Sequence, residues 1–299
     1  MKIVAIKGGL GNQMFQYALA YRLQLDNPDE EVYIDVSHFS GYQFHNYELK
    51  MVFDVALPEA PKSKLWKVTY PIGNYKLYRA VRKFLPNRRS EYIEPRLFTF
   101  WPEVLELKGN KYIDGSWQNE SYFKDKREDI LKLFEFKKPL EGKNIELEDK
   151  LHNSNSVSIH VRRGNFLMFD EYKGICDLPY YKNAVEYVKT KIDNPKFFVF
   201  SNDALWCQEN IAPLCADYEI VDWNKGDDSY LDMRMMSMCP TNIIAHSSFS
   251  WWAAWMNNND NKLVVAPYEW LRQPGLTDKP QLKDWVLIKN EYNGTGTED

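Results

Sequence analysis

The sequence predicts an α/β protein made of two halves, each with a parallel sheet covered by helices. Short apolar segments typical of buried strands alternate with longer segments of helical periodicity, most regularly between residues 157 and 266. The chain has 299 residues, of which 44% are hydrophobic and 27% charged, enough for one large domain or two ordinary ones. A polar, lysine-rich stretch at 136–154 is the predicted linker, so the halves are expected at 1–145 and 146–299.

The first half opens with a β-α-β unit. Residues 2–6 are apolar and run into glycines, which predicts a buried strand followed by a tight turn. A helical segment with apolar residues on one face comes next, and 32–36 predict a second strand that carries Asp35. Farther along, 111–115 predict a strand and 121–134 a helix.

Residues 60–100 have a different character and are expected to be loosely helical. Aromatic and basic residues are concentrated there, and no clear strand pattern is present. The residues concerned are Trp66, Tyr70, Tyr75 and Tyr78, followed by a basic cluster of Arg82, Lys83, Arg88 and Arg89.

The second half alternates regularly, which favours a doubly wound parallel sheet. Ligands bind to such sheets beyond the carboxyl ends of the strands, so the loops that follow strands are the candidate site segments. Strands are expected at 157–161, 197–201, 218–221, 242–245 and 263–266, and helices at 179–191, 204–210, 229–238 and from 251 onward.

Charge and composition exclude several classes of protein. The net charge is −4 and the pI about 5.8, so no nucleic-acid partner is expected. No apolar run approaches 18 residues, and the apolar start is too short for a signal peptide. We expect a cytoplasmic protein, with attachment at the inner face of the membrane left open. None of the four cysteines is spaced as C-x-x-C, so they are expected to be buried free thiols: Cys176, Cys207, Cys215 and Cys239.

The first motif is the glycine-rich loop Gly8–Gln13, between the first strand and the first helix. Such a loop lets a ligand approach the N–H groups of a helix N-terminus. It matches the dinucleotide fingerprint at Gly9 and Gly11 but has Met14 where a third small residue is expected. A nicotinamide site, a structural turn and another ligand site all remain open on these residues.

The second motif, His160–Asn165, follows a predicted strand with two adjacent arginines, Arg162 and Arg163. An arginine presents a planar, permanently charged fork that can hold two phosphate oxygens at once. An exposed, ion-paired loop is the alternative. A third segment, Ser201–Asp203, also follows a strand and is more typical of an ordinary helix cap.

The fourth motif is His246–Trp252, after the strand at 242–245. Small hydroxyl residues at a helix start supply N–H and O–H donors together with the positive end of the helix dipole, which suits a diphosphate. A capped, tryptophan-rich buried helix is the alternative. The chain contains no Asp-x-Asp pair of the kind that holds Mn²⁺ or Mg²⁺, so no metal and no other cofactor is expected.

Together these segments resemble glycosyltransferase family 11, the α-1,2-fucosyltransferases, and its bacterial members in particular. Most of the chain takes part, and the order and spacing of the segments carry the resemblance. They are GGLGNQMFQYALA, His45-x-Tyr47-x-Leu49, GSWQNE at 115–120, HVRRGN, FVFSND with Trp206, and HSSFSWWAAW.

The resemblance implies a GT-B-like fold, with two Rossmann-type halves facing across a cleft. It further implies inverting, metal-independent transfer of L-fucose from GDP-β-L-fucose to the 2-hydroxyl of a terminal galactose, in a free oligosaccharide or a lipid-linked glycan. The first half would bind the acceptor and the second the donor. Arg162 would contact the diphosphate and Asp232 the guanine. The full donor set is Asn12, Gln13, His160, Arg162, Arg163, Asp232, Ser247, Ser248, Phe249 and Ser250, and the acceptor set is His45, Trp117 and Gln118.

The proton acceptor for the incoming hydroxyl is expected among the acidic and histidine residues. Asp170 lies after the arginine motif at a spacing that resembles the base of a related α-1,6 enzyme, and with Arg162 it is the predicted catalytic pair. A solvated loop acid is the alternative for Asp170. Competing candidates are Glu171, Asp35, His45 and Glu48.

One residue departs from the family pattern. Asn165 stands where relatives commonly have Asp, and an amide cannot carry the negative charge or act as a base. An inactive nucleotide- or glycan-binding homologue is therefore one alternative function. A nicotinamide-dependent oxidoreductase that uses the Gly9-x-Gly11 loop is another.

Overall fold

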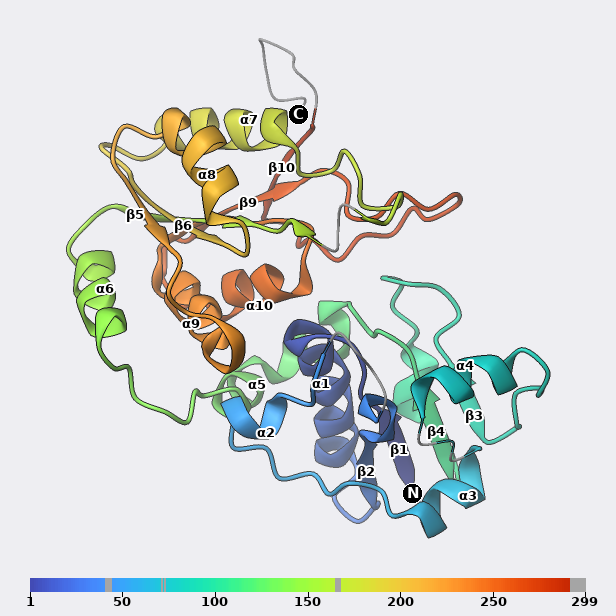
Figure 1. Ribbon diagram of the computed structural model, residues 1–299. Coiled ribbons are helices and arrows are strands. Elements are labelled where there is room, and N and C mark those ends of the chain that lie inside the picture. The colour runs from blue at the N-terminus through green and yellow to red at the C-terminus, as the bar shows by residue number, and fades with distance from the viewer. Residues whose placement is uncertain (41–44, 71, 73, 165–167, 291–299) are drawn as a thin grey trace. The chain divides into compact units, whose positions relative to one another are not determined.

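The computed structural model describes residues 1–40, 45–70, 72, 74–164 and 168–290 (Figure 1). The chain forms two compact units, Met1–Lys138 and Pro139–Asp299. The boundary thus lies before the expected 145, because much of the lysine-rich stretch is not a linker. Residues Lys143–His152 form helix α6, which buries Leu147 and Leu151 in the second unit.

The first unit contains a four-stranded parallel sheet with the order β2-β1-β4-β3. Its first strand is completely buried, as expected for an apolar segment with neighbours on both sides. The strand β3 was not predicted, because it is three residues long and only partly buried. The strands are β1 Lys2–Ala5, β2 Val32–Asp35, β3 Glu91–Ile93 and β4 Lys111–Asp114.

Helices cover both faces of this sheet. α1 packs against β1 and β2, whereas Leu65 and Val68 of α3 pack on the opposite face with Ile3 and Tyr112 (Figure 1). The helix expected at 121–134 is shorter than predicted, because its first part forms separate 3₁₀ turns. The helices are α1 Leu10–Asp26, α2 Leu49–Val52, α3 Lys62–Val68, α4 Tyr75–Arg82 and α5 Arg127–Leu133.

The second unit contains a six-stranded parallel sheet with the order β10-β9-β8-β5-β6-β7. The chain first builds outward from β5 through β6 to β7, then returns to the other side of β5 and builds through β8 to β10. The strands are β5 Ser156–Val161, β6 Lys196–Ser201, β7 Tyr218–Val221, β8 Thr241–Ile243, β9 Leu263–Pro267 and β10 Val286–Ile288.

Helices lie on both faces of this sheet. Residues of α7 and α8 join the core on one face, whereas α9 and α10 pack together on the other, with α6 against α9 (Figure 1). In α10, Trp251, Trp252 and Trp255 are all fully buried, and the Trp251 indole donates to the Pro280 carbonyl at 2.8 Å. The helices are α7 Leu178–Lys189, α8 Ala204–Asn210, α9 Tyr230–Met238 and α10 Ser248–Met256.

The expected α/β class of GT-B-like type is confirmed, since each unit is built on a parallel sheet with helices on both faces. The four cysteines are free, and three of them are buried. Across the described ranges, no helix combines the length and the apolar character needed to cross a bilayer.

Candidate functional site

The sheet of the second unit has a single point at which the strand order reverses. β5 lies between β6 and β8, so the loops after β5 and β8 run in opposite directions. In open parallel sheets such a reversal leaves a crevice at the carboxyl ends of the two strands. Arg162 follows β5 directly, and Ser247 lies in the loop after β8. The second and fourth sequence motifs therefore meet at the place where this topology binds ligands.

The two arginines after β5 are not equivalent. The Arg163 guanidinium pairs with Asp203 at 3.2 Å and lies 4.1 Å from the centre of the Trp206 ring. The backbone N–H of Arg163 donates to the Asn202 side-chain oxygen at 3.0 Å. These contacts tie Arg163 to the start of α8. Arg162 is half-buried, and burial lowers the pKa of its guanidinium. Arg162 directly follows Val161, the last residue of β5, and so lies at the strand end where this topology binds ligands.

The N-terminus of α10 supplies the second half of this region. Ser247 is the N-cap residue, and its hydroxyl accepts the N–H of Phe249 at 3.3 Å. Ser248 is partly exposed in the first turn. The hydroxyl of Ser250 is buried and donates to the Ala245 and Ser247 carbonyls at 3.3 and 3.4 Å. Of the predicted serines, Ser247 and Ser248 remain suited to an anion, whereas Ser250 holds the turn in place.

His160 and Phe249 form the apolar wall beside Arg162. Their ring centres are 5.7 Å apart. Burial, reinforced by the charge of Arg162, lowers the pKa of His160 to about 3, so its imidazole is neutral at physiological pH. Its Nδ1 has no hydrogen-bond partner among the described residues. His160 can thus offer shape and a hydrogen bond to a ligand, but no positive charge.

Asp232 lies in the first turn of α9 and is partly buried. The Asn224 side chain donates to its carboxylate at 2.8 Å and also exchanges hydrogen bonds with Asn144. Burial raises the pKa of Asp232 to about 7, against the opposing effect of the Asn224 hydrogen bond. A buried carboxylate with so little compensation suits a ligand that brings N–H donors.

The predicted base Asp170 is placed far from such surroundings. Its side chain is 91% exposed and pairs with Lys173 at 2.6 Å, and this hydrogen bond lowers the pKa of its carboxyl. This geometry matches the solvated loop acid that the sequence left open. Asn165 lies outside the described residues.

The first unit has its own cavity, of about 420 Å³, at the carboxyl ends of its strands. Residues that follow each of the four strands within three positions line it, among them Lys7 after β1, His38 after β2 and Glu94 after β3. The complete lining is Lys7, Gly8, Asn12, Gln16, His38, Phe39, Ile93, Glu94, Leu97, Asp114, Gly115 and Ser116.

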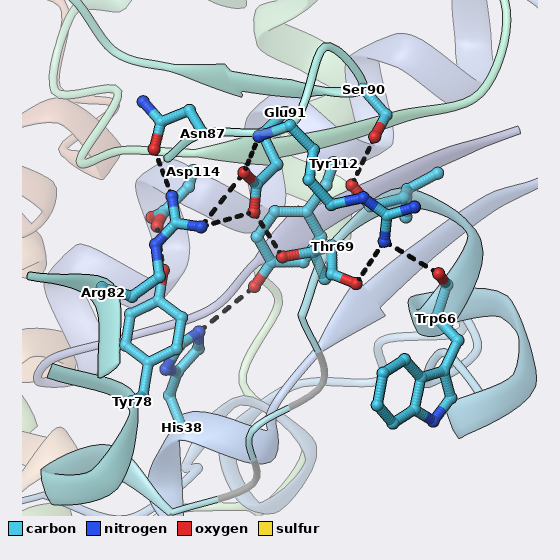
Figure 2. Close-up of polar contacts among 12 residues, drawn as sticks. His38, Trp66, Thr69, Tyr78, Arg82, Asn87, Ser90, Glu91, Tyr112 and Asp114 are labelled. Atoms are coloured by element: carbon cyan, nitrogen blue, oxygen red, sulfur yellow. Dashed lines mark hydrogen bonds and ion pairs between the residues drawn. The ribbon is translucent and has the colours of Figure 1, made fainter. Parts of the chain in front are cut away.

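Charges on one wall of this cavity are internally balanced. Asp114 accepts a hydrogen bond from Lys7, which lowers the pKa of the Asp114 carboxyl despite its burial, and another from Tyr78 at 3.3 Å. His38 lies beside them, 3.1 Å from the Tyr112 hydroxyl (Figure 2). The Tyr112 hydroxyl in turn donates to Asp35 at 2.8 Å. Burial lowers the pKa of His38, so this wall is rich in hydrogen-bonding groups but not in net charge.

Glu94 is the cavity residue that sequence analysis missed. Its Oε2 accepts the Ser116 N–H at 2.6 Å, whereas Oε1 is shielded from solvent and has no hydrogen-bond partner among the described residues. Burial raises the pKa of its carboxyl. A side chain at Gly115 would lie 2.5 Å from the Glu94 Cβ, so the glycine makes room for it. The only sequence signal was a carboxylate after an unrecognised strand.

The glycine loop positions two of the predicted donor residues differently. Gln13 is fully buried, and its amide bonds to the carbonyls of Gly8 and Asn46 and to the Glu48 N–H at 2.8–2.9 Å. It therefore shapes the loop. Asn12 lines the cavity, and its side-chain oxygen Oδ1 accepts a hydrogen bond from the Gln118 side-chain amide at 2.8 Å.

The predicted acceptor residues also divide. His45 packs over Gly9, where an added Cβ would lie 3.2 Å from its ring. Gln118 is largely buried. It does not line the cavity itself, but it donates a hydrogen bond to Asn12, which does. Trp117 is fully buried and stacks on Tyr92, with ring centres 6.1 Å apart, so its ring supports the site from behind. In the described part of the chain, no three His, Cys, Asp or Glu residues cluster as they would around a metal ion.

The glycosyl transferase family 11 model matches residues 1–289. The chain belongs to this family. Similar curated proteins include an alpha-1,2-colitosyltransferase of Escherichia coli, 32% identical over 96% of this chain and 98% of that protein. The O-antigen biosynthesis glycosyltransferase WbnK of Escherichia coli is 30% identical over 89% of this chain and 93% of its own length. Galactoside alpha-(1,2)-fucosyltransferase 2 of Pongo pygmaeus is 26% identical over 92% and 73%.

The solved structures to which the chain is similar include two fucosyltransferases. NodZ alpha-1,6-fucosyltransferase, soaked with GDP-fucose, has a TM-score of 0.49 and 14% identity, covering 85% of this chain and 91% of that one. POFUT1 in complex with GDP-fucose has a TM-score of 0.39 and 12% identity, covering 89% and 97%. Membership of family 11 places the chain among glycosyltransferases and sets aside the nicotinamide interpretation of the Gly8–Gln13 loop.

Proposed function

We propose that this family 11 protein transfers L-fucose from GDP-β-L-fucose to the 2-hydroxyl of a terminal galactose, with inversion to an α-1,2 linkage. The observation that carries the proposal is the position of Arg162 and of the α10 N-terminus after the neighbouring strands β5 and β8, at the reversal point of the second sheet. A guanidinium and a helix start together can neutralise a diphosphate without a divalent cation.

The departing diphosphate sets the demands on the second unit. As the bond between the fucose anomeric carbon and the phosphate oxygen breaks, negative charge develops on GDP, and the sugar acquires oxocarbenium character. Arg162 and the Ser247–Ser248 turn would stabilise that charge, as preorganised donors do in an oxyanion hole. His160 and Phe249 would close the apolar side.

Asp232 gives the second unit a means of recognising the base. Guanine presents two adjacent N–H donor groups, and an ionised carboxylate accepts both. Binding would convert the costly buried charge of Asp232 into a paired one. The nucleotide would therefore bind its diphosphate end at Arg162 and its base end at Asp232.

The first unit would bind the acceptor sugar. Its cavity has hydrogen-bonding groups of both kinds but little net charge, which fits a neutral polyhydroxylated ring. Asn12 and Gln118 provide a linked pair of amides at its edge, with His45 over the neighbouring glycine loop. The acceptor is a galactose-terminated oligosaccharide or lipid-linked glycan. The proposal assigns the reaction to the cytoplasm and involves no nucleic acid.

A colitosyltransferase among the relatives provides a second candidate donor sugar. Colitose differs from L-fucose only by lacking the 3-hydroxyl, so the two donors share every feature that Arg162 and Asp232 recognise. Sites that hydrogen-bond a substrate hydroxyl reject the analogue without it strongly, so a direct comparison of the two donors decides between them.

The test is incubation of the full chain with GDP-fucose and lactose, with and without EDTA, and in parallel with GDP-colitose. We expect GDP release and a 2-fucosylated product in both EDTA conditions. GDP binding without product would identify an inactive binding homologue. Loss of turnover in EDTA would overturn the metal-independent mechanism, and product only with GDP-colitose would overturn the fucose assignment.

A further inference from the structure

One segment of the first unit has an unusual charge. Residues 61–90 contain nine Lys and Arg and no Asp or Glu, although the whole chain has a net charge of −4. This segment includes α3 and α4, and none of its described residues lines the cavity. The proposed sugar transfer therefore leaves this concentration of positive charge unexplained.

Two arginines of the segment are used to hold it in place. Arg82 pairs with the buried carboxylate of Glu91 at 3.1 Å, and Arg88 donates to the carbonyls of Trp66 and Thr69 at 2.9 and 2.7 Å (Figure 2). Because these bonds anchor the segment to β3 and α3, the remaining basic residues are displayed from a fixed framework. Those fully exposed are Lys62, Lys67, Lys76, Lys83 and Arg89.

Large apolar side chains are exposed among these basic residues. Trp66 is 63% exposed, Leu77 55% and Phe84 87%. Phe84 is the most exposed of them, and it directly follows the basic pair Arg82 and Lys83. Exposed aromatic and aliphatic side chains surrounded by lysines are typical of segments that lie in the interface of a bilayer.

We propose that the basic–aromatic surface of residues 62–89 binds the anionic surface of a lipid bilayer. The lysines and Arg89 would approach lipid phosphates, and Trp66, Leu77 and Phe84 would enter the boundary between headgroups and acyl chains. The exposed apolar residues favour a bilayer over other polyanions, because a nucleic-acid backbone offers no apolar phase for an aliphatic side chain such as Leu77. The inference concerns a surface that the transfer reaction does not use, so it stands apart from the proposed function.

The test is co-sedimentation of the full chain with phosphatidylcholine vesicles, with and without phosphatidylglycerol. The wild type should bind the anionic vesicles, and added salt should weaken the binding. Replacing Lys62, Lys67 and Lys83 together by Glu should weaken it by at least about tenfold. The matched control, Lys108→Glu/Lys124→Glu/Lys132→Glu, changes the net charge equally on exposed lysines of the same unit and should stay within about twofold.

A second variant tests the apolar part. Trp66→Ser/Phe84→Ser should bind anionic vesicles several-fold more weakly and keep wild-type transfer to lactose. An absence of wild-type binding would overturn the proposal, as would equal losses in the two lysine variants. So would binding of an unrelated DNA duplex as tight as vesicle binding and unaffected by Trp66→Ser/Phe84→Ser, because that outcome identifies a general polyanion site.

A separate observation concerns the proton of the acceptor hydroxyl. Glu94 lines the first cavity, and one of its oxygens is fixed by Ser116 while the other has no hydrogen-bond partner among the described residues. The neighbouring Asp114 is already engaged by Lys7 and Tyr78. Glu94 is thus the cavity carboxylate with capacity for a new hydrogen bond.

We infer that Glu94 accepts the proton of the acceptor's 2-hydroxyl, an inference that rests on the proposed function. The hydroxyl O–H bond breaks as its oxygen bonds to the fucose anomeric carbon, whose bond to GDP breaks in the same step. Glu94 takes the proton and later releases it to water, while GDP leaves with the electron pair. Burial and the charge of Asp114 raise the pKa of Glu94, whereas Lys7 and the Ser116 and Trp117 N–H groups oppose this.

Glu94→Gln keeps the shape and can still accept the Ser116 N–H. We expect kcat to fall about 10²–10⁴-fold, with GDP binding and the acceptor KM little changed. Wild-type kcat/KM should decline as pH falls through the raised pKa of Glu94, and the variant should lose that acidic limb, which a purely structural role would not cause. Wild-type transfer with an unimpaired Glu94→Gln variant would overturn the role of Glu94 alone, whereas an inactive wild type would overturn the proposed function.

Discussion

The two parallel sheets have their candidate sites at equivalent places, but the side chains at those places differ in charge. Each carries its polar loops at the carboxyl ends of parallel strands, where a change of strand order opens a crevice. At the second sheet the loops present a guanidinium, a helix N-terminus and a neutral histidine. At the first, carboxylates and Lys7 balance one another around the cavity. The comparison teaches that topology selects the location of a site and that loop residues select its ligand.

Among the substitutions considered for the two sites, Arg162→Ala should have the largest effect, because it removes the charge that makes the second site suited to an anion. We expect kcat to fall about 10²–10³-fold, the loss typical of one preorganised donor, together with weaker GDP binding. Steady-state kinetics and calorimetry measure the two effects.

Arg163→Ala is the matched control for that variant. It removes the Asp203 pair and the Trp206 contact, so it should lower the melting temperature while transfer falls by less than about tenfold. Equal kinetic losses at the two positions would contradict the division of roles between the arginines.

Asp232→Asn should move stability and binding in opposite directions. The folded-state pKa of Asp232 is raised to about 7, above the unfolded value, so the folded protein is penalised increasingly as pH rises from the unfolded value to 7. Removing the charge should therefore stabilise the ligand-free protein by about 1–3 kcal/mol more at pH 8 than at pH 5. GDP should bind about 10–100-fold more weakly.

Denaturant unfolding at the two pH values, combined with GDP titration, checks the Asp232 prediction. A substitution at the cavity of the first unit is the control for the GDP titration, because the proposal assigns GDP binding to the second unit and such a substitution should leave GDP affinity unchanged. Tighter GDP binding by Asp232→Asn would remove guanine recognition from this residue.

Asp170→Asn should have the smallest effect. Its carboxylate is solvated and paired with a lysine on the same loop, and exposed pairs of this kind contribute little. We expect kcat within about twofold of wild type, because the variant alters neither sheet edge. A loss of transfer with GDP binding intact would restore Asp170 as the base and displace Glu94.

The buried strands were predictable from sequence, because 157–161 and 197–201 are rich in apolar residues and have neighbouring strands on both sides. β3 was not, since an edge strand of three residues, none of them buried, leaves no periodic signal. The helix α6 was hidden by its lysines, which face solvent while Leu147 and Leu151 carry the packing.

The sequence predicted which loops form the candidate site, but it did not predict which side chains contact one another there. The residue types alone did not separate the two arginines after β5, and only the resemblance assigned the diphosphate to Arg162. The contacts of Arg163 with Asp203 and Trp206 could not be predicted from the motif. Likewise, GSWQNE indicated Trp117 and Gln118, but nothing in the letters shows that the tryptophan is buried. Glu94 became visible only when β3 placed it beside Gly115.

The backbone of Trp117 has a consequence for how the first cavity can evolve. Its φ of 56° lies in the left-handed region, which costs a non-glycine residue on the order of 1 kcal/mol or more. Burial of the indole against Tyr92 and Tyr122 holds this conformation, and the same turn aims the Ser116 and Trp117 amides at Glu94. Substitutions at those two tyrosines would therefore change the surroundings of Glu94 and so the reaction with the acceptor, even though neither tyrosine lines the cavity.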